Sequence, residues 1–234
     1  MKLLDRTCMV SDFVTQNPSV SGLFERLGID FCCQGRQSLV SACEQKGLDV
    51  DSVMQQIAEI PGEVGLGSLS LTRLADHVVA LHHEYLRESL PILTAQVDRV
   101  ATVHGPAQPE LVELQSVFRH FAREMREHME KEEQILFPLI RRLDSEVGVP
   151  GAATSLPRIL HVMEADHEQS GSALQKMRQL THDYAIPEGA CGTYREMLKG
   201  LVELEEDTHI HVHTENHILF PRALSLATGS SQGL

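Results

Sequence analysis

The chain reads His-Met-Glu-Lys-Glu-Glu-Gln-Ile-Leu-Phe-Pro from His128 to Pro138, and the pattern His-x-x-x-Glu-x-x-Ile-Leu-Phe-Pro returns from His211 to Pro221. A helix turns by about 100° per residue, so a histidine and a glutamate four positions apart project from the same face. Each copy therefore presents one imidazole and one carboxylate side by side. The repeat predicts two helices with the same role in one helical protein.

A further histidine precedes each copy at nearly the same offset. His83 lies 45 residues before His128, and His167 lies 44 residues before His211. Four helices would then bring four histidines and two glutamates around one interior, namely His83, His128, Glu132, His167, His211 and Glu215. Six such ligands suit two metal ions with both carboxylates as bridges. The sequence therefore predicts one shared, pseudo-symmetric metal site.

The ligand types indicate the metal. No cysteine falls within these segments, and mixed nitrogen and oxygen ligation favours non-haem iron or manganese over structural zinc. Iron is the preferred assignment. A single His-x-x-x-Glu pattern arises easily by chance, whereas two copies in matching contexts favour metal binding. The Ile-Leu-Phe-Pro runs themselves indicate core packing, and Pro138 and Pro221 predict helix kinks.

The composition is that of a globular protein with one large or two smaller domains. Of 234 residues, 42% are hydrophobic and 23% are charged, and disorder is expected only at residues 228–234. The net charge of −13, with no basic cluster, argues against a nucleic-acid partner. Neither a membrane span nor a signal peptide is predicted. The five cysteines are irregularly spaced and form no secreted disulfide framework, so the cytoplasm is the expected compartment.

Helical periodicity dominates and alternating strand-like runs are scarce, which predicts an all-α fold. Residues 1–60 predict a small helical domain, with Gly28 as a helix stop and Asp49 as a helix N-cap. Residues 61–68 contain three glycines and predict a linker. The segment 69–228 predicts an antiparallel up-down-up-down four-helix bundle. Its helices are expected at about residues 70–104, 109–146, 157–184 and 193–226.

The other histidines need a separate interpretation. His82 and the residues flanking His211 should point away from the metal site. His209, His213 and His217 form an i, i+4, i+8 stripe that could bind zinc, although the first half of the chain has no counterpart. The remaining ones are interpreted as solvated or packed side chains: His77, His120, His161 and His182.

His104 follows His83 by 21 residues. A continuous helix would separate them by about 31 Å, whereas the ions of a two-metal site lie about 3.5 to 4 Å apart. Geometry therefore opposes a shared ligand role for His104, unless the chain folds back.

Together with Asp-Phe-Cys-Cys at residues 30–33, the duplicated motif and its upstream histidines resemble the repair-of-iron-centres (RIC, YtfE/ScdA-type) di-iron proteins. That family joins a short Cys-Cys domain to a hemerythrin-like bundle, and the resemblance covers nearly the whole chain. It implies the same six ligands and two non-haem iron ions, with an oxo or hydroxo bridge. It also implies a secondary or channel role for His104, and a homodimer.

The Cys-Cys turn carries the second set of candidates. Cys32 and Cys33 are expected to act in redox chemistry or iron transfer, and a disulfide between neighbours would be strained and easily reduced. The alternative is two loop cysteines, one buried and one exposed. The family usually reads Cys-Cys-Gly-Gly, whereas this chain has Gln34 in the third position. The other cysteines are interpreted as inert: Cys8, Cys43 and Cys191.

Three functions compete at this point. The resemblance implies a cytoplasmic stress protein that restores iron–sulfur clusters damaged by nitric oxide or oxidants, through iron donation or redox action. Its partners would then be damaged iron–sulfur proteins, and no nucleic acid or membrane is expected. The second hypothesis is a di-iron enzyme or sensor that binds or reduces NO or O₂. The third is a purely structural metal ion that only stabilises the helix bundle. The cysteine pair favours the first.

Overall fold

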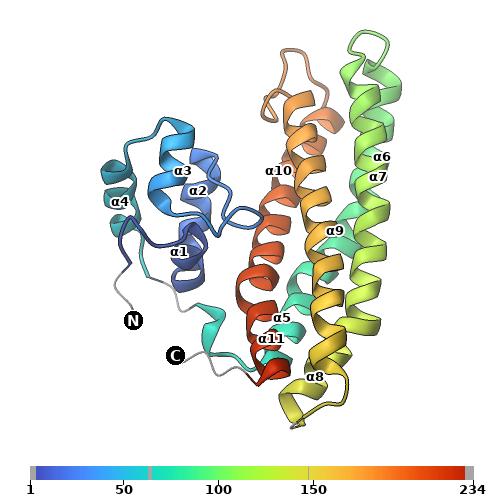
Figure 1. Ribbon diagram of the computed structural model, residues 1–234. Coiled ribbons are helices and arrows are strands. Elements are labelled where there is room, and N and C mark those ends of the chain that lie inside the picture. The colour runs from blue at the N-terminus through green and yellow to red at the C-terminus, as the bar shows by residue number, and fades with distance from the viewer. Residues whose placement is uncertain (1–3, 63–64, 147, 230–234) are drawn as a thin grey trace. The chain divides into compact units, whose positions relative to one another are not determined.

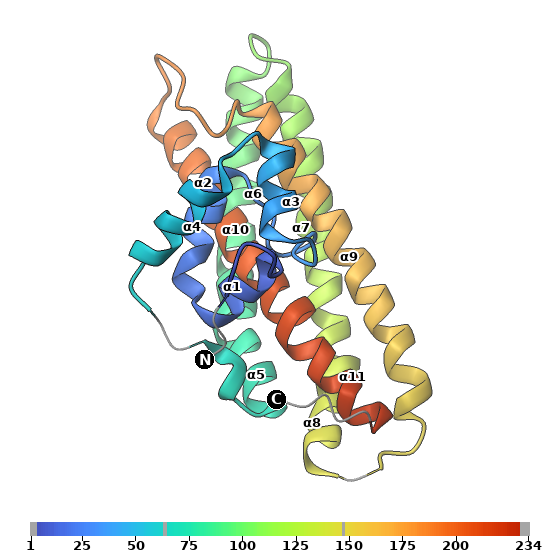
Figure 2. The same cartoon turned by 60° about the vertical axis from the view of Figure 1, so that its left-hand side comes forward.

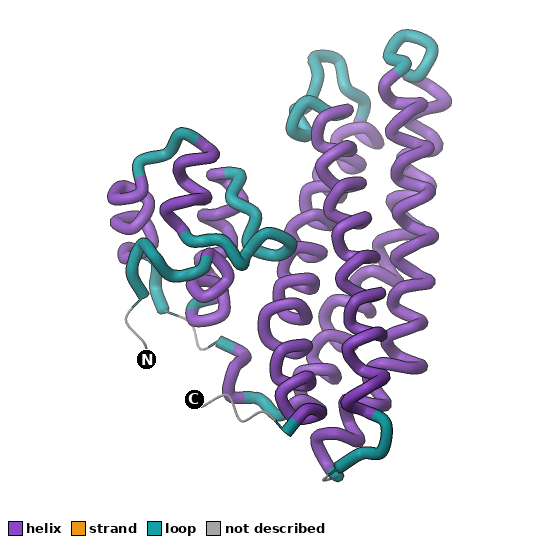
Figure 3. The backbone as a smooth tube through the Cα atoms, in the orientation of Figure 1, coloured by secondary structure: helices purple, strands orange, loops and turns teal. Residues whose placement is uncertain are grey.

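The computed structural model describes residues 4–62, 65–146 and 148–229, and its regular elements are helices (Figures 1 and 3). Within these ranges, a single isolated β-bridge joins Met9 and Ser38, and no helix combines the length and apolar character needed to cross a membrane. The all-α prediction is confirmed. Residues 63 and 64 of the expected linker and residues 230–234 of the expected disordered tail lie outside the described residues.

The chain divides into two compact units. Unit 1 comprises residues 1–75, 140–153 and 209–234, and unit 2 comprises residues 76–139 and 154–208. Each unit is described by itself below.

Four short helices form the N-terminal part of unit 1: α1 (Val10–Gln16), α2 (Ser21–Leu27), α3 (Leu39–Lys46) and α4 (Val50–Glu59). Helices α2 and α3 end at Gly28 and Gly47, whose φ angles of 64° and 66° are left-handed and cost glycine little. Asp49 caps α4 by accepting hydrogen bonds from the backbone N–H groups of Asp51 and Ser52. The predictions for Gly28 and Asp49 are confirmed. The segment expected as a linker contains a 3-10 turn, η2 (Leu66–Ser68).

The long helical patterns correspond to successions of helices interrupted by π-helical turns. The first is α5 (Leu71–Val78), η3 (Val79–His83) and α6 (Glu84–His104), and the second is α7 (Glu110–Lys131), η4 (Glu132–Leu136) and α8 (Phe137–Ser145). The third is α9 (Ala152–Leu180), and the last is α10 (Gly192–His213), η5 (Thr214–Leu219) and α11 (Phe220–Thr228).

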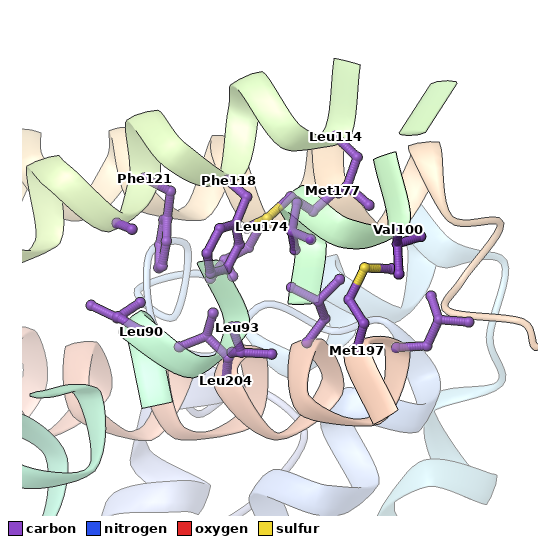
Figure 4. Close-up of a cluster of buried hydrophobic side chains, with 14 of the residues drawn as sticks. Leu90, Leu93, Val100, Leu114, Phe118, Phe121, Leu174, Met177, Met197 and Leu204 are labelled. Carbon is purple, nitrogen blue, oxygen red and sulfur yellow. The ribbon is translucent and has the colours of Figure 1, made fainter. Parts of the chain in front are cut away.

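Unit 2 is an antiparallel four-helix bundle. Its members are α6, α7, α9 and the part of α10 up to residue 208, which run side by side in both views (Figures 1 and 2). All four contribute to one apolar core, in which Leu90, Phe118 and Met197 are fully buried and Leu174 is 1% exposed (Figure 4). The bundle prediction is confirmed. The bundle carries the predicted histidine ligands of the first three long helices.

Unit 1 has its own core. The rings of Phe13, Phe24 and Phe31 form a chain of contacts with centroid separations of 6.3 and 6.4 Å. Val212 of α10 belongs to the same buried cluster. The N-terminal helices therefore pack on the C-terminal end of α10 within this unit.

Two local predictions need correction. The third long helix begins at Ala152 rather than near Pro157, and Pro157 lies inside its second turn, where proline cannot donate the backbone hydrogen bond to residue 153. It ends at residue 180 because His182, Asp183 and Tyr184 have left-handed φ angles of 51° to 58°.

Where the sequence predicted proline kinks, the structure has two π-helical turns, η4 and η5. Each turn ends directly before a Phe-Pro dipeptide. Proline lacks the N–H that would bond four residues back, so a wider turn at this point costs little.

The bundle core should dominate the stability of unit 2. Replacing Phe118 by alanine leaves a large cavity among tightly packed side chains, so the free energy of unfolding should fall by about 3–5 kcal/mol. Chemical denaturation of metal-free protein, followed by circular dichroism, measures this change. Val103→Ala on α6, at a position 60% exposed, should change it by less than about 0.5 kcal/mol. Equal effects of both variants would contradict this core assignment.

Candidate metal centre

Three of the six predicted ligands lie in π-helical turns. His83 is the last residue of η3, Glu132 is the first of η4, and Glu215 is the second of η5. A π turn accommodates one extra residue and so rotates the following side chains relative to a regular α-helix. These turns set the direction in which the ligands point, and only two of the three are accompanied by a nearby proline.

Unit 2 brings four of the predicted residues together in its interior. The exposed fractions are 0% for His83 and Glu132, 3% for His128 and 1% for His167. The Nε2 atoms of His128 and His167 are 3.0 Å apart. Glu132 Oε1 lies 3.3 Å from His128 Nε2, while Glu132 Oε2 lies 3.2 Å from His83 Nε2.

These separations fit ligands that share a metal ion. Two ligand atoms about 2.1 Å from one ion are about 3.0 Å apart at octahedral angles and about 3.4 Å apart at tetrahedral angles. The observed distances lie within this interval. Moreover, the two oxygens of Glu132 face different histidines, His83 and His128. Imidazole and carboxylate donors suit non-haem iron.

Two acidic residues orient the histidines. Glu133 Oε1 accepts a hydrogen bond of 2.5 Å from His83 Nδ1. Asp166 Oδ2 lies 3.3 Å from His128 Nδ1 and 2.9 Å from the Lys131 ammonium. Because an ionised carboxylate only accepts, each Nδ1 carries the proton and each Nε2 keeps its lone pair for a metal. His128 and Lys131 lower the pKa of Asp166 to about 2, against the opposing effect of burial.

Glu133 and Asp166 were not predicted, although each directly adjoins a predicted ligand. Glu133 directly follows Glu132, and Asp166 directly precedes His167. Arg87 adds a further ion pair with Glu133. The partners of Glu133 and Asp166 lie far away along the chain, so residue spacing alone did not identify them.

The other two predicted ligands lie in unit 1. His211 and Glu215 are 1% and 0% exposed, and His211 Nε2 is 3.4 Å from Glu215 Oε2. This i, i+4 pair matches His128 and Glu132 in its spacing and its burial. His211 lies in α10, which ends at His213, and Glu215 lies in the π turn η5 that follows.

The secondary candidate His104 ends α6, which is continuous from Glu84. Its Nε2 is 3.5 Å from Cys191 Sγ, and its ring lies 5.4 Å from that of Tyr194. His82, the neighbour of His83, contacts Asp207 through Nδ1 at 2.8 Å.

The stripe of His209, His213 and His217 binds the N-terminal helices within unit 1. His209 Nδ1 pairs with Glu25 at 2.5 Å, and His213 Nδ1 donates to the carbonyl of Phe31 at 3.2 Å. Burial and His217 lower the pKa of His213 to about 3, so it is neutral. The role considered for this stripe, adventitious zinc binding, is therefore replaced by hydrogen bonding to protein groups.

The Cys-Cys turn is one of the segments to which this histidine stripe is hydrogen-bonded. His217 Nε2 donates to the carbonyl oxygen of Cys32 at 2.8 Å, and Asn216 Nδ2 donates to the same oxygen at 3.4 Å. Asp30 Oδ1 accepts from the backbone N–H groups of Cys32 and Cys33, at 3.0 and 2.8 Å. The side chain of Cys32 is buried, whereas Cys33 is half-buried. The turn is thus tied to the π turn that carries Glu215.

The departure at Gln34 leaves this turn intact. Gln34 is exposed, whereas Gly35 is buried. A Cβ at Gly35 would lie 2.3 Å from the carbonyl oxygen of Phe31 and 2.9 Å from His217 Nε2. The glycine that the close approach requires is therefore Gly35, which this chain retains.

Comparisons with known proteins cover both parts of the chain. The family described as "Hemerythrin HHE cation binding domain" matches residues 74–223, and ScdA_N, described as "Domain of Unknown function (DUF542)", matches residues 6–60. The iron-sulfur cluster repair protein ScdA of Staphylococcus epidermidis is 34% identical over 226 residues, which cover 94% of this chain and 99% of that protein. The protein of the same name from Staphylococcus haemolyticus is 35% identical, covering 93% and 98%. The iron-sulfur cluster repair protein YtfE of Escherichia coli is 36% identical, covering 89% and 92%.

The orienting role of Glu133 can be tested by replacing it with alanine. His83 would lose the partner that fixes its protonation and ring direction, so affinity for Fe²⁺ should fall about 10–100-fold. Competition with a chromophoric chelator measures this affinity. Glu130→Ala, at an exposed position of α7, is the matched control and should leave the affinity unchanged. An unaltered affinity in Glu133→Ala would exclude the orienting role.

Proposed function

This chain belongs to the ScdA/YtfE-type iron–sulfur cluster repair family, and from that premise we propose that it restores damaged iron–sulfur clusters by handing on iron from a di-iron centre. The proposal has two parts, a bundle that stores the iron and a thiol-bearing turn that transfers it. The proposed setting is the cytoplasm under nitrosative or oxidative stress. The recipients would be iron–sulfur proteins whose clusters have lost iron.

The storage site is proposed to hold two non-haem iron ions with six protein ligands: His83, His128, Glu132, His167, His211 and Glu215. The arrangement of Glu132 between two histidines supports a bridging carboxylate. The matched spacing and burial of His211 and Glu215 support an equivalent second half. When bound, the iron would supply redox chemistry and an exchangeable position for NO or O₂. The buried side chains would keep it from water, and Glu133 and Asp166 orient the imidazoles of His83 and His128.

The two bridging assignments can be tested by iron content. Glu132→Ala and Glu215→Ala each remove a carboxylate bridge, so each variant should bind fewer than two irons per chain after anaerobic reconstitution. His104→Ala is the matched control and should retain two, because continuous α6 carries it about 31 Å from His83. Two irons in Glu215→Ala, with an unchanged near-ultraviolet spectrum, would contradict the six-ligand site.

One contact carries the transfer part of the proposal. His217 lies two residues beyond Glu215 and holds the carbonyl of Cys32 at 2.8 Å. The thiol pair is thereby tied to the segment that bears a proposed iron ligand. The hydrogen bond between Cys32 and Cys33, together with the burial of Cys32, raises the pKa of the Cys32 thiol well above its usual range. The thiolate is the form that binds a metal ion, so transfer requires that Cys32 lose its proton when it takes up the iron.

The transfer role predicts a separation of binding from repair. The double variant Cys32→Ser, Cys33→Ser should keep the two irons of the storage site and its NO binding, because neither thiol belongs to that site. It should nevertheless lose most of its ability to restore activity to a nitrosylated iron–sulfur enzyme. The double variant Cys8→Ser, Cys191→Ser is the matched control and should repair normally. Full repair by the first variant would point instead to the bundle acting alone as an NO- or O₂-reactive centre.

A further inference from the structure

We propose that Asp30, Cys32 and Cys33 form a second metal site, which binds one divalent ion of the iron and zinc class. Their ligand atoms, one from each side chain, all lie within 4.8 Å of one another. Among the residues that the structure describes, no other group of three metal-ligating side chains contains a cysteine. In the transfer role proposed above, this site would hold the ion that is handed on. Only this biological role of the site rests on the proposed function.

The distances agree with tetrahedral coordination. The two sulfur atoms are 3.7 Å apart, and Cys32 Sγ is 3.4 Å from Asp30 Oδ1. Two thiolates about 2.3 Å from one ion at a tetrahedral angle are about 3.8 Å apart, and a thiolate and a carboxylate oxygen are about 3.5 Å apart. Both observed separations lie close to these values. A disulfide would instead require a sulfur separation of about 2.05 Å.

The backbone already holds the ligands in place. Asp30 Oδ1 accepts the N–H groups of both cysteines, so the carboxylate and the backbone that carries the thiols cannot separate without breaking two hydrogen bonds. His217 and Asn216 donate hydrogen bonds to the carbonyl of Cys32. Close contact at Gly35 leaves no room for a side chain there. Little ordering of the turn would be needed when an ion binds.

The ligand set leaves room for a further ligand from a recipient protein. Three protein ligands leave one tetrahedral position open, as in zinc sites that bind substrate rather than in closed structural sites. Cys33 is half-buried, so a partner's ligand can reach this position from solvent. Two thiolates and one carboxylate give a net charge of −1 on the divalent complex. Binding of the ion releases both thiol protons to solvent. The ion then takes the place of the hydrogen bond that joins the two sulfur atoms.

Cobalt is a suitable probe because Co²⁺–thiolate bonds give charge-transfer absorption in the near ultraviolet, whereas histidine and carboxylate ligands do not. Full-length protein with its bundle loaded with iron is titrated anaerobically with Co²⁺, and difference spectra are recorded. We expect one equivalent of sulfur-bound Co²⁺ per chain. X-ray absorption of the same protein loaded with one Zn²⁺ should show two sulfur neighbours at about 2.3 Å.

Three variants and one matched control locate the site. Cys32→Ser, Cys33→Ser should lose the sulfur band altogether. Asp30→Asn keeps an oxygen that accepts the two backbone hydrogen bonds but removes the charge, so Co²⁺ affinity should fall at least about tenfold. The double variant Cys8→Ser, Cys191→Ser is the matched control and should match the wild type. Cys33→Ser, which alters only the half-buried thiol, should lower the band intensity even if the double variant is poorly folded.

Two results would overturn the proposal. One is a wild-type chain without a sulfur band at one equivalent, and the other is a band that survives in Cys32→Ser, Cys33→Ser. Neither result depends on repair. A chain that binds Co²⁺ at this turn but repairs no cluster would contradict the proposed function alone, whereas repair without the sulfur band would contradict the metal site alone.

Discussion

The buried carboxylate of Glu132 is the constraint on which the bundle interior depends. It is completely shielded from solvent, and removing an ionised carboxylate from water costs several kcal/mol unless partners compensate. Its neighbours His83 and His128 turn Nε2 toward it, while their Nδ1 atoms are committed to Glu133 and Asp166. The negative charge and the available nitrogen lone pairs both favour a cation. Metal binding should therefore contribute to folding stability as well as to function.

The π turns explain how regular helices can place polar metal ligands in an apolar interior. A straight α-helix places i and i+4 on one face, but the direction of that face is dictated by the apolar core along the rest of the helix. In α6 and α7 the core residues, such as Leu90 and Phe118, occupy the bundle centre. A π turn at η3 and η4 changes the register locally, so that the polar ligands can also face inward. The helix interruption thus reconciles apolar packing with a polar site.

The sequence predicted the helices and the ligand types because both follow from short spacings. Gly28 and Asp49 act through adjacent backbone groups, so local chemistry was sufficient. The long-range partners were not predictable in this way, because Glu133 meets His83 across 50 positions and His217 meets Cys32 across 185. The π turn at η3 has no proline within it and no other local signal that we recognised. The place of His211 and Glu215 in the centre stays a prediction.

The end of α10 combines two roles on opposite faces. His209, His213 and His217 follow one face at i, i+4 and i+8, and they bind the N-terminal helices and the Cys-Cys turn. His211 and Glu215 are offset from this stripe by two residues, about 200° around the helix. Because η5 contains both Glu215 and His217, a rotation of this turn that displaces the carboxylate also displaces the hydrogen bond to Cys32. The hydrogen bonds to the carbonyl of Cys32 therefore couple the thiol turn to the segment that carries Glu215.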